Sequence, residues 1–435
     1  MDIGVIGAGY VGLVTAAGLA ATGHRVRVGE ADPRKLAQLQ TGDVPIYEAD
    51  LQRIVAESMD NGLLEFVGDN LEAVNGASVG LLALPTPPAD DGSADLEILE
   101  SALRSLSGGL SPNTVVALKS TVPVGSVARF QSLLDELGVE CTVVSNPEFL
   151  REGTAVADFF HPDRIVVGSN DQDATDTLIE MYHDIQAPVV VTDPPSAEMI
   201  KYASNAYLAT RVTFANALAN LCEAVGADIS DVLKGMGADR RIGFHFFNPG
   251  PGYGGSCLPK DTKALVAMAD AAGYDFSLLR GVVAVNELQL ERVVEKVDAV
   301  VAQLSGARIG VWGLAFKAGT DDIRESPATK LADALVERGA VVTAYDPAVR
   351  SVPNPEIAIA DDPIEAARGA DVLVIVTEWS EFKGVDLRSV RDAMAGSVIV
   401  DARNLLDPIL VTQMGMTYVG IGRAGRPVPV PDSTA

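Results

Sequence analysis

The sequence has few cysteines and few positive charges. Only 3 of its 435 residues are cysteine, too few for a disulfide framework in a chain of this length, so we expect a reducing, cytoplasmic compartment. Lysine and arginine number 33 against 59 aspartates and glutamates, which gives a formal net charge of −26. A chain this acidic repels nucleic-acid backbones unless it carries a concentrated basic run. The sequence has no such run, so we expect no nucleic-acid partner.

The sequence also lacks uncharged runs of membrane-spanning length, with residues 3–23 as the one exception. That run follows Asp2 rather than a basic segment, and glycines that include Gly7, Gly9, Gly12 and Gly18 interrupt it. A buried strand, a glycine turn and a core-facing helix explain it better than a signal peptide or a span. We therefore expect no membrane association. The four histidines lack metal-ligand spacing and there is no C-x-x-C, so we expect no metal site.

The sequence contains short apolar strand patterns that alternate with helical patterns. Its hydrophobic content of 48% and charged content of 21% are typical of globular proteins. Strands are predicted over residues 2–6, 25–29, 79–84, 114–119, 142–144, 165–167 and 189–191, and again over 308–313, 341–345, 372–376 and 398–401. Such alternation predicts mostly parallel, doubly wound sheets.

The stretch between the two strand-rich regions is helical. A long helix is predicted from residue 196 to about 225, and further helices over 258–271 and 278–303, with a glycine-rich loop at 248–256. We therefore expect an α/β fold with two Rossmann-like, doubly wound domains joined by a central all-helical region. The expected domains are residues 1–195, 196–300 and 301–435, with a loose tail from about 424.

The clearest motif is a G-x-G-x-x-G turn that follows the first strand and opens a helix. Its residues are Gly7, Gly9, Tyr10, Val11 and Gly12. Glycines here let the backbone approach a pyrophosphate, and the helix N-terminus supplies amide donors. Glu30 ends the second strand, where a carboxylate can bind both ribose hydroxyls. We therefore expect NAD rather than NADP, a preference that the nearby Arg34 and Lys35 weaken slightly.

The second α/β domain departs from this fingerprint. Its first strand, residues 308–313, contains Gly310 and Gly313, but no G-x-G-x-x-G motif is present, so we do not expect a second NAD. Lys317 and Arg324 follow the carboxyl end of that strand, where open α/β sheets bind ligands. We expect this domain to bind another anion; the alternative is that both residues are solvated surface charges.

Cys257 is the candidate nucleophile. It follows a glycine-rich loop and opens a helix with Lys260 nearby, a setting that favours a reactive thiolate. Asp261 lies one turn further on, where it could polarise a water molecule or tune the thiol. Cys141 and Cys222 lie in apolar strand and helix patterns, so we expect both to be small buried hydrophobes.

Four further polar residues are candidates for the same chemistry. Lys201 and Asn205 are four residues apart on the long helix and share a face, where they could stabilise an oxyanion beside Cys257. Thr121 and Glu148 follow two strands at their carboxyl ends, as a water-positioning hydroxyl and an acid/base respectively. Each of the four also fits an ordinary polar residue of a helix or loop.

Together these motifs resemble the UDP-glucose/GDP-mannose dehydrogenase family over essentially the full chain. The resemblance rests on GAGYVG, KSTVPVG, NPEFLREGTA, GYGGSCLPKD, GLAFKAGTDDIRESPA and DARNLLDP. The last of these, with YVGIGR after it, looks like the UDP-glucose branch rather than the GDP-mannose branch.

The resemblance implies an NAD-dependent, four-electron oxidation of UDP-glucose at C6. The alcohol becomes an aldehyde, Cys257 adds to it as a thiohemiacetal, a second hydride transfer gives a thioester, and water releases the acid. The same chemistry on dTDP-glucose, GDP-mannose or a UDP-N-acetylhexosamine stays open, because Leu258 and Ala402 replace residues more usual in the family. The competing classes are a two-electron β-hydroxyacid dehydrogenase and a non-catalytic NAD-binding scaffold.

The resemblance also implies a role for each matched residue. Lys201 and Asn205 would stabilise the oxyanion, while Asp261, Glu148 and Thr121 would position and activate water. The implied cofactor contacts are the glycine-turn residues with Glu30, Lys35, Thr86, Thr121, Glu152, Lys260 and Arg324. The implied substrate contacts are Phe149, Leu150, Arg151, Lys201, Asn205, Arg241, Tyr253, Gly254, Lys317 and Arg403. Arg241 matches an arginine that the family contributes from a neighbouring subunit, so we expect a homo-oligomer, at least a dimer, with the helical region as its dimerisation region.

Overall fold

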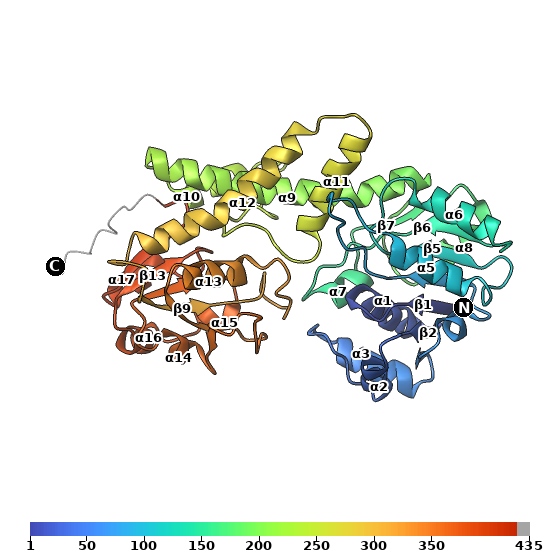
Figure 1. The fold of residues 1–435 in the computed structure, drawn as a ribbon, viewed down its shortest axis with the longest axis horizontal. Coiled ribbons are helices and arrows are strands. Elements are labelled where there is room, and N and C mark those ends of the chain that lie inside the picture. Colours follow the sequence, from blue (N-terminus) through green and yellow to red (C-terminus); the bar gives the residue numbers. More distant parts are fainter. Residues whose placement is uncertain (424–435) are drawn as a thin grey trace. The chain divides into compact units, whose positions relative to one another are not determined.

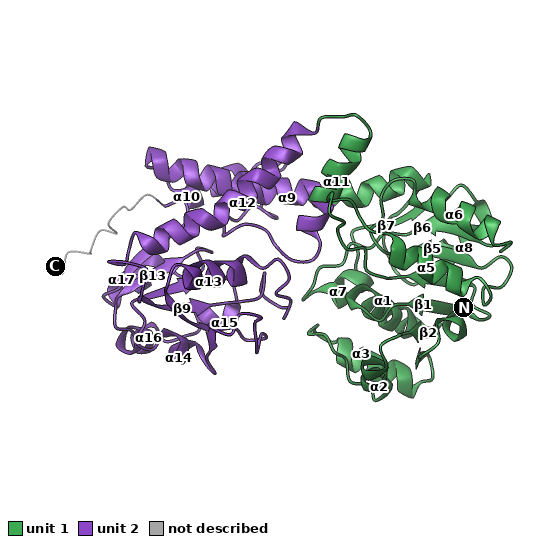
Figure 2. Ribbon diagram, viewed as in Figure 1, with its two compact units in different colours: residues 1–204, 263–275 green, residues 205–262, 276–435 purple. Residues whose placement is uncertain are grey.

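The structure is a computed structural model that describes residues 1–423, so the loose tail predicted from about residue 424 lies outside the described residues. The chain forms two compact units, coloured separately in Figure 2. Unit 1 contains residues 1–204 and 263–275; of the described residues, unit 2 contains 205–262 and 276–423. Two of the long helices contribute to both units, and the division into three domains stays a prediction.

Unit 1 is built on an eight-stranded sheet with the order β3-β2-β1-β4-β5-β6-β7-β8 (Figure 1). The strands are β1 (Asp2–Ile6), β2 (Arg25–Gly29), β3 (Leu64–Val67), β4 (Val79–Leu82), β5 (Val115–Leu118), β6 (Thr142–Ser145), β7 (Ile165–Gly168) and β8 (Val189–Thr192). Neighbouring strands are parallel except β6 and β7, which meet antiparallel at Ser145 and Gly168. The predicted doubly wound sheet is therefore confirmed, with β3 as an additional strand that had not been predicted.

Three helices of unit 1 begin at aspartate caps. Asp32, Asp69 and Asp171 each accept a hydrogen bond from a backbone amide in the first turn of the helix that follows. The helices are α1 (Tyr10–Ala21), α2 (Pro33–Gln40), α3 (Leu51–Asp60), α4 (Asn70–Val74), α5 (Glu97–Leu106), α6 (Ser126–Glu136), α7 (Ala155–Phe160) and α8 (Gln172–Met181). Helix α1 is buried from Gly12 to Ala20, as expected of a core-facing helix.

Unit 2 contains a six-stranded, fully parallel sheet with the order β11-β10-β9-β12-β13-β14. The strands are β9 (Arg308–Trp312), β10 (Val341–Tyr345), β11 (Ala358–Ile359), β12 (Val372–Ile375), β13 (Val398–Asp401) and β14 (Thr417–Gly420). This order repeats that of β3-β2-β1-β4-β5-β6 in unit 1, which confirms a second Rossmann-like sheet. Its core includes Trp312, whose ring stacks on Phe382 with centroids 5.0 Å apart.

The long helix predicted in the middle of the chain is α9, which begins at Pro194. It starts two residues earlier than predicted because Asp193 accepts the Ser196 amide over 2.8 Å and proline fits a first turn. The remaining helices are α10 (Ile229–Gly237), α11 (Leu258–Ala271), α12 (Ser277–Asp298), α13 (Pro327–Glu337), α14 (Pro363–Ala367), α15 (Ser380–Lys383), α16 (Leu387–Ala393) and α17 (Pro408–Gln413), and α9 ends at Val225. No helix within residues 1–423 has both the length and the apolar character needed to cross a membrane.

Candidate active site

The glycine turn after β1 has the geometry that a bound phosphate requires. Gly7 has φ +99°, and a Cβ there would lie 2.7 Å from the carbonyl oxygen of Ala83. A Cβ on Gly12 would lie 1.8 Å from the Gly7 oxygen, whereas a Cβ on Gly9 would meet nothing within 4 Å. The turn and the packing of α1 thus require Gly7 and Gly12, while Gly9 leaves open space beside the helix N-terminus, where backbone amides bind anions.

Glu30 lies immediately after β2, where it was predicted. Its carboxylate is 2.9 Å from the Lys35 ammonium and accepts the Asp32 amide, also over 2.9 Å. The side chain of Arg34 is 94% exposed. Of the two predicted basic neighbours, only Lys35 therefore contacts the acid.

Glu48 joins the glycine turn to the segment after β6, a connection that the sequence did not reveal. The Tyr10 hydroxyl donates a hydrogen bond to the Glu48 carboxylate. The Gly153 amide donates to Glu48 Oε2 over 2.7 Å and is 2.8 Å from the Tyr10 hydroxyl oxygen. Tyr10 is consequently linked through one buried carboxylate to Gly153, the residue that follows the predicted segment 149–152.

Thr86 and Thr121 lie together at the carboxyl ends of β4 and β5. The Thr86 hydroxyl donates to the carbonyl oxygen of Thr121 over 3.0 Å, and Thr86 is 6% exposed. The loops after these two strands are thereby fixed to each other, and both predicted residues occupy one edge of the sheet.

Lys201 and Glu148 form a buried ion pair in unit 1. Lys201 Nζ lies 3.0 Å from Glu148 Oε1, with side-chain exposures of 5% and 7%. The second Glu148 oxygen accepts the Leu150 amide over 2.5 Å. The sequence predicted both residues but not their pairing.

The residues next to Glu148 are held by other charged side chains. The Phe149 ring centroid lies 3.4 Å from the Arg164 guanidinium and 5.3 Å from Lys201 Nζ. Burial lowers the pKa of Arg164, a residue that had not been predicted. Arg151 is a predicted substrate contact through its backbone, and its side chain forms a two-bond ion pair with Asp158 at 2.5 and 3.0 Å.

Cys257 occupies the position before α11, as predicted. Its carbonyl accepts the Asp261 amide over 3.0 Å, the first hydrogen bond of the helix, and its sulfur lies 3.6 Å from the Ser256 hydroxyl oxygen. The Cys257 thiol is half-buried, whereas Cys141 and Cys222 are buried. Burial raises the pKa of the thiols of Cys141 and Cys222. The helix N-terminus offers Cys257 a positive dipole.

Asp261 is fully buried, and both of its oxygens have donors in unit 2. Lys260 Nζ lies 2.6 Å from Oδ1, and Asn205 Nδ2 lies 2.6 Å from Oδ2. The structure thus brings the predicted residues Asn205, Lys260 and Asp261 into one cluster. Lys260 and Asp261 lie one helical turn after Cys257.

The glycine-rich loop packs closely on the loop after β9. A Cβ on Gly254 would lie 2.2 Å from the Glu325 carbonyl oxygen, and one on Gly255 would lie 2.7 Å from the Phe316 ring. The Gly255 amide also donates to the Arg324 carbonyl over 3.1 Å. Only glycine fits this approach. The loop also contains the buried Tyr253, whose hydroxyl pKa burial raises.

Arg403 supports the same loop after β9. Its guanidinium donates to the carbonyl oxygens of Val376 over 2.8 Å and Phe316 over 3.1 Å, and pairs with Glu378 at 3.0 Å. Lys317 follows Phe316 and lies 5.8 Å from its ring centroid. The Arg324 side chain pairs with Asp322 at 2.6 Å. Arg403 and Lys317 are therefore brought to the same end of the second sheet.

In the second sheet, Asp346 accepts the backbone amides at the place that corresponds to the dinucleotide turn. It directly follows β10, as Glu30 follows β2, but it is fully buried. Its Oδ2 accepts the backbone amides of Leu314 over 2.8 Å and Ala315 over 3.0 Å. Amides at the place of the phosphate-binding turn are therefore bound by the protein's own carboxylate.

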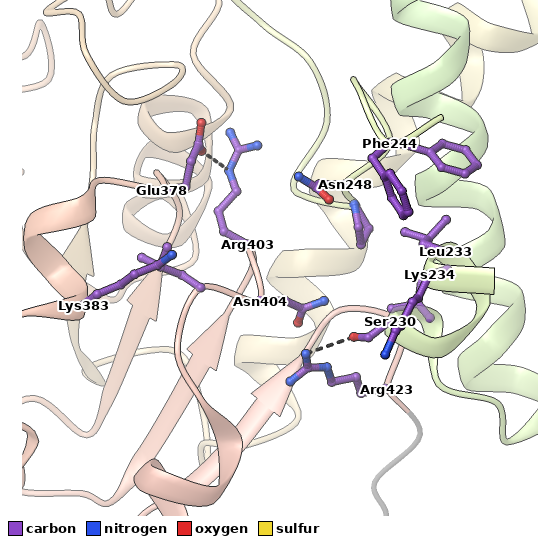
Figure 3. A pocket seen from close by; sticks show the side chains of 14 residues that line it. Ser230, Leu233, Lys234, Phe244, Asn248, Glu378, Lys383, Arg403, Asn404 and Arg423 are labelled. Atoms are coloured by element: carbon purple, nitrogen blue, oxygen red, sulfur yellow. Dashed lines mark hydrogen bonds and ion pairs between the residues drawn. The ribbon is translucent and has the colours of Figure 1, made fainter. Parts of the chain in front are cut away.

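A cavity of about 550 Å³ in unit 2 includes Arg403 in its lining (Figure 3). The lining carries four basic side chains against the single acid Glu378. These are Lys234, Lys383, Arg403 and Arg423. Figure 3 shows Arg423 joined to Ser230, a hydrogen bond of 3.0 Å. The volume is in the range of small-ligand pockets, and its charge suits an anion.

An apolar stripe lies along α9 in unit 2. Tyr207, Phe214 and Leu221 are spaced seven residues apart and are 61%, 50% and 56% exposed. Arg241, predicted to act in a neighbouring subunit, has an 88% exposed side chain paired with Asp239 at 2.6 Å.

Within residues 1–423, no cluster of three or more histidine, cysteine or acidic side chains is arranged to hold a metal ion.

Sequence models of one family match the chain in three consecutive stretches. The matches are the UDP-glucose/GDP-mannose dehydrogenase family NAD binding domain over residues 1–186, its central domain over 195–288 and its UDP binding domain over 310–408.

Curated relatives and solved structures are similar over nearly the whole chain. A UDP-glucose 6-dehydrogenase of Pseudomonas aeruginosa is 42% identical over 97% of this chain and 98% of its own length. One of Rhizobium meliloti is 43% identical over 97% and 100%. A UDP-glucose dehydrogenase structure from Pyrobaculum islandicum has a TM-score of 0.89 at 37% identity, covering 97% of this chain and 98% of that one.

Proposed function

Because this chain belongs to the UDP-glucose/GDP-mannose dehydrogenase family, we propose that it oxidises UDP-glucose at C6 to UDP-glucuronate, using two equivalents of NAD. The observation that carries the proposal is Cys257 at the N-terminus of α11. An aldehyde is oxidised readily by hydride loss only after a nucleophile adds to it, and a simple alcohol oxidation needs no such residue.

The residues of unit 1 fit NAD. The open space at Gly9 and the N-terminus of α1 suit the pyrophosphate, and Glu30 suits the ribose hydroxyls. NAD, when bound, accepts a hydride from C6 in each of the two oxidations.

The covalent steps of this proposal are assigned to Cys257, with Lys201 and Asn205 as oxyanion donors. The thiolate adds to the C6 aldehyde, and after the second oxidation water displaces it from the thioester. Lys201 and Asn205 stabilise the oxyanion of each tetrahedral species. Lys201 donates a hydrogen bond to Glu148 and Asn205 donates one to Asp261, so each carboxylate orients its donor.

Water activation is assigned to the carboxylates and to Thr121. Glu148 and Thr121 follow adjacent strands β6 and β5 of the sheet. A carboxylate that gives up its ammonium partner during the reaction becomes a base for the hydrolytic water. Lys317 and Arg403 bind the diphosphate end of the substrate, supported by the basic cavity lining around Arg403.

The active unit of this proposal is a homodimer in the cytoplasm. A seven-residue spacing keeps Tyr207, Phe214 and Leu221 on one helix face, and exposed apolar stripes of this kind mark interaction surfaces. We propose that a second copy of the chain packs on this stripe. Each copy would then supply its Arg241 to the active site of the other. A reducing compartment keeps the Cys257 thiol available.

The proposal is tested by counting reduced cofactor. The purified protein is incubated with excess NAD and a limiting amount of UDP-glucose, dTDP-glucose, GDP-mannose or a UDP-N-acetylhexosamine. We expect the highest kcat/KM with UDP-glucose, two NADH per substrate, and a uronate by mass spectrometry. One NADH per substrate would instead indicate a two-electron dehydrogenase, and preference for another sugar nucleotide would reject UDP-glucose as the substrate.

A further inference from the structure

Helix α6 is capped by a residue from a distant helix. Gly125 stands at its N-cap with φ +96° and has no side chain to satisfy the first amides. Glu198 of α9 takes that role: its Oε2 accepts the Gly125 amide over 2.6 Å, and its Oε1 accepts the Val127 amide over 2.8 Å. Glu198 is only 2% exposed.

This cap differs from the others in unit 1. Asp32, Asp69 and Asp171 cap their own helices from the preceding residue. Glu198 reaches across 71 to 73 residues of sequence, and burial raises the pKa of its carboxyl group. A buried carboxylate is a costly way to satisfy two amides, so its position calls for a reason beyond the stability of α6.

The two residues joined by this contact lie in segments that also contain proposed catalytic residues. Gly125 ends the loop after β5, which contains Thr121. Glu198 precedes Lys201 by three residues on α9, so the two lie on neighbouring turns of one face. Lys201 in turn is paired with Glu148 after β6. Helix α9 is thereby tied to the loops after both strands, by Glu198 to one and by Lys201 to the other.

We propose that Glu198 is a positioning residue, which holds the Thr121 loop in register with the Lys201–Glu148 pair for hydrolysis of the thioester. The inference rests on the proposed function. Shifts of about 1 Å in reacting groups cost up to about a hundredfold in rate, so a second anchor between α9 and the Thr121 loop has a direct catalytic value.

The test uses the full chain with Glu198→Gln. Glutamine keeps the size of the side chain but offers one acceptor oxygen, so one of the two amides faces an NH₂ group. We expect kcat to fall about tenfold or more. The KM for NAD should change less than kcat, because the glycine turn and Glu30 are untouched although Thr121 is also an expected cofactor contact. We also expect the covalent intermediate on Cys257 to accumulate in intact-mass spectra, since hydrolysis is the slowed step.

Asp171→Ala is the matched control, paired with Glu198→Ala. Asp171 caps α8 through the Ala174 amide at 2.8 Å, on a helix that carries none of the proposed catalytic residues. We expect a lower Tm in both alanine variants, but a lower kcat and accumulated intermediate only in the Glu198 variant. If Glu198→Ala does not fold, Glu198→Gln decides the question.

Two results would overturn the inference. One is a Glu198→Gln enzyme with wild-type kcat and no accumulated intermediate. The other is unchanged hydrogen exchange of residues 119–125 in that variant without substrate, because the loop would then not depend on the cap. The exchange measurement needs no turnover, so it still tests the contact if the wild-type protein fails to oxidise UDP-glucose and the proposed function is wrong.

Discussion

Asn205 donates a 2.6 Å hydrogen bond to Asp261, and both side chains are buried. The other Asp261 oxygen is 2.6 Å from the Lys260 ammonium. The carboxylate therefore lies between an amide and a cation, and it fixes the direction in which the amide presents its donors. Lys201 has the same relationship to Glu148 in unit 1. In both cases a carboxylate orients a donor of the proposed oxyanion site.

Replacing Asn205 by alanine tests the first of these relationships. Asn205→Ala leaves Asp261 Oδ2 buried without its donor, which costs about 1–3 kcal/mol of stability. It also removes a proposed oxyanion donor, so we expect kcat to fall about a hundredfold. Steady-state kinetics and thermal melts measure the two effects. Asn220→Ala is the control, because Asn220 lies on the same helix and its amide bonds Gln289; a wild-type kcat is expected there, and a wild-type kcat in Asn205→Ala would refute the role.

Cys257→Ala tests the covalent mechanism. Without the thiolate the aldehyde cannot form a thiohemiacetal, so we expect uronate formation to fall by at least about a thousandfold. Product is measured by mass spectrometry rather than by NADH alone, since the first oxidation does not need the thiol. Cys222→Ala should keep full activity because Cys222 is a buried thiol within α9. Uronate formation at the wild-type rate by Cys257→Ala would exclude a thioester.

Glu30→Ser tests the assignment of the ribose site. The carboxylate held by Lys35 at 2.9 Å is replaced by a smaller, neutral group that tolerates a 2′-phosphate. We expect kcat/KM for NAD to fall about tenfold or more, and the preference for NAD over NADP to shrink. Arg34→Ser should leave that ratio unchanged, since the Arg34 side chain is 94% exposed. An undiminished preference in Glu30→Ser would place the ribose elsewhere.

A charge in the α9 stripe tests the homodimer. Phe214 is 50% exposed in the middle of the stripe, so Phe214→Glu would bury a carboxylate in the proposed interface and we expect dissociation to monomers. Light scattering after size-exclusion chromatography measures the mass, and activity should fall with it if Arg241 acts across the interface. Leu410→Glu is the control, because Leu410 is equally exposed at 51% but lies on α17. A monomeric wild-type protein with full activity would contradict the proposal.

The parts of the site that the sequence predicts are those with local signals. Gly7 and Glu30 directly follow strands and Cys257 directly precedes a helix, and periodicity and glycine spacing locate such boundaries within a residue or two. The structure places all three at those boundaries. Such positions depend on short stretches of chain, which a sequence pattern describes well.

The parts that the sequence does not predict depend on contacts between distant segments. Glu48 bonds Gly153 across 105 residues, and Glu198 bonds Gly125 across 73. Neither glutamate has a local pattern that separates it from a solvated charge, and Glu198 fits an ordinary acid in the first turns of a helix. The cavity side chains Lys234 and Lys383 lie on α10 and α15, and they come together only when these two helices are packed in unit 2. Tertiary packing, rather than propensity, decides these positions.

Tyr345 supplies a pH-dependent test of the second sheet. It ends β10, next to Asp346, and its hydroxyl donates to Glu381 over 2.7 Å. Burial, together with this bond to a carboxylate, raises the pKa of Tyr345 to about 12. The folded state therefore holds the phenolic proton more tightly than the unfolded state, whose tyrosines have a pKa of about 10.

The sign of the effect follows from that difference. The stabilisation is complete below pH 10 and is lost as the pH rises from about 10 to about 12. Tyr345→Phe has no such proton, so the stability advantage of the wild type over the variant should shrink over that range. Urea melts at pH 9 and pH 11.5, with tyrosinate absorption followed in parallel, measure the trend. A difference in free energy of unfolding that stays constant between these pH values would show that Tyr345 titrates normally, and would remove Glu381 as its partner.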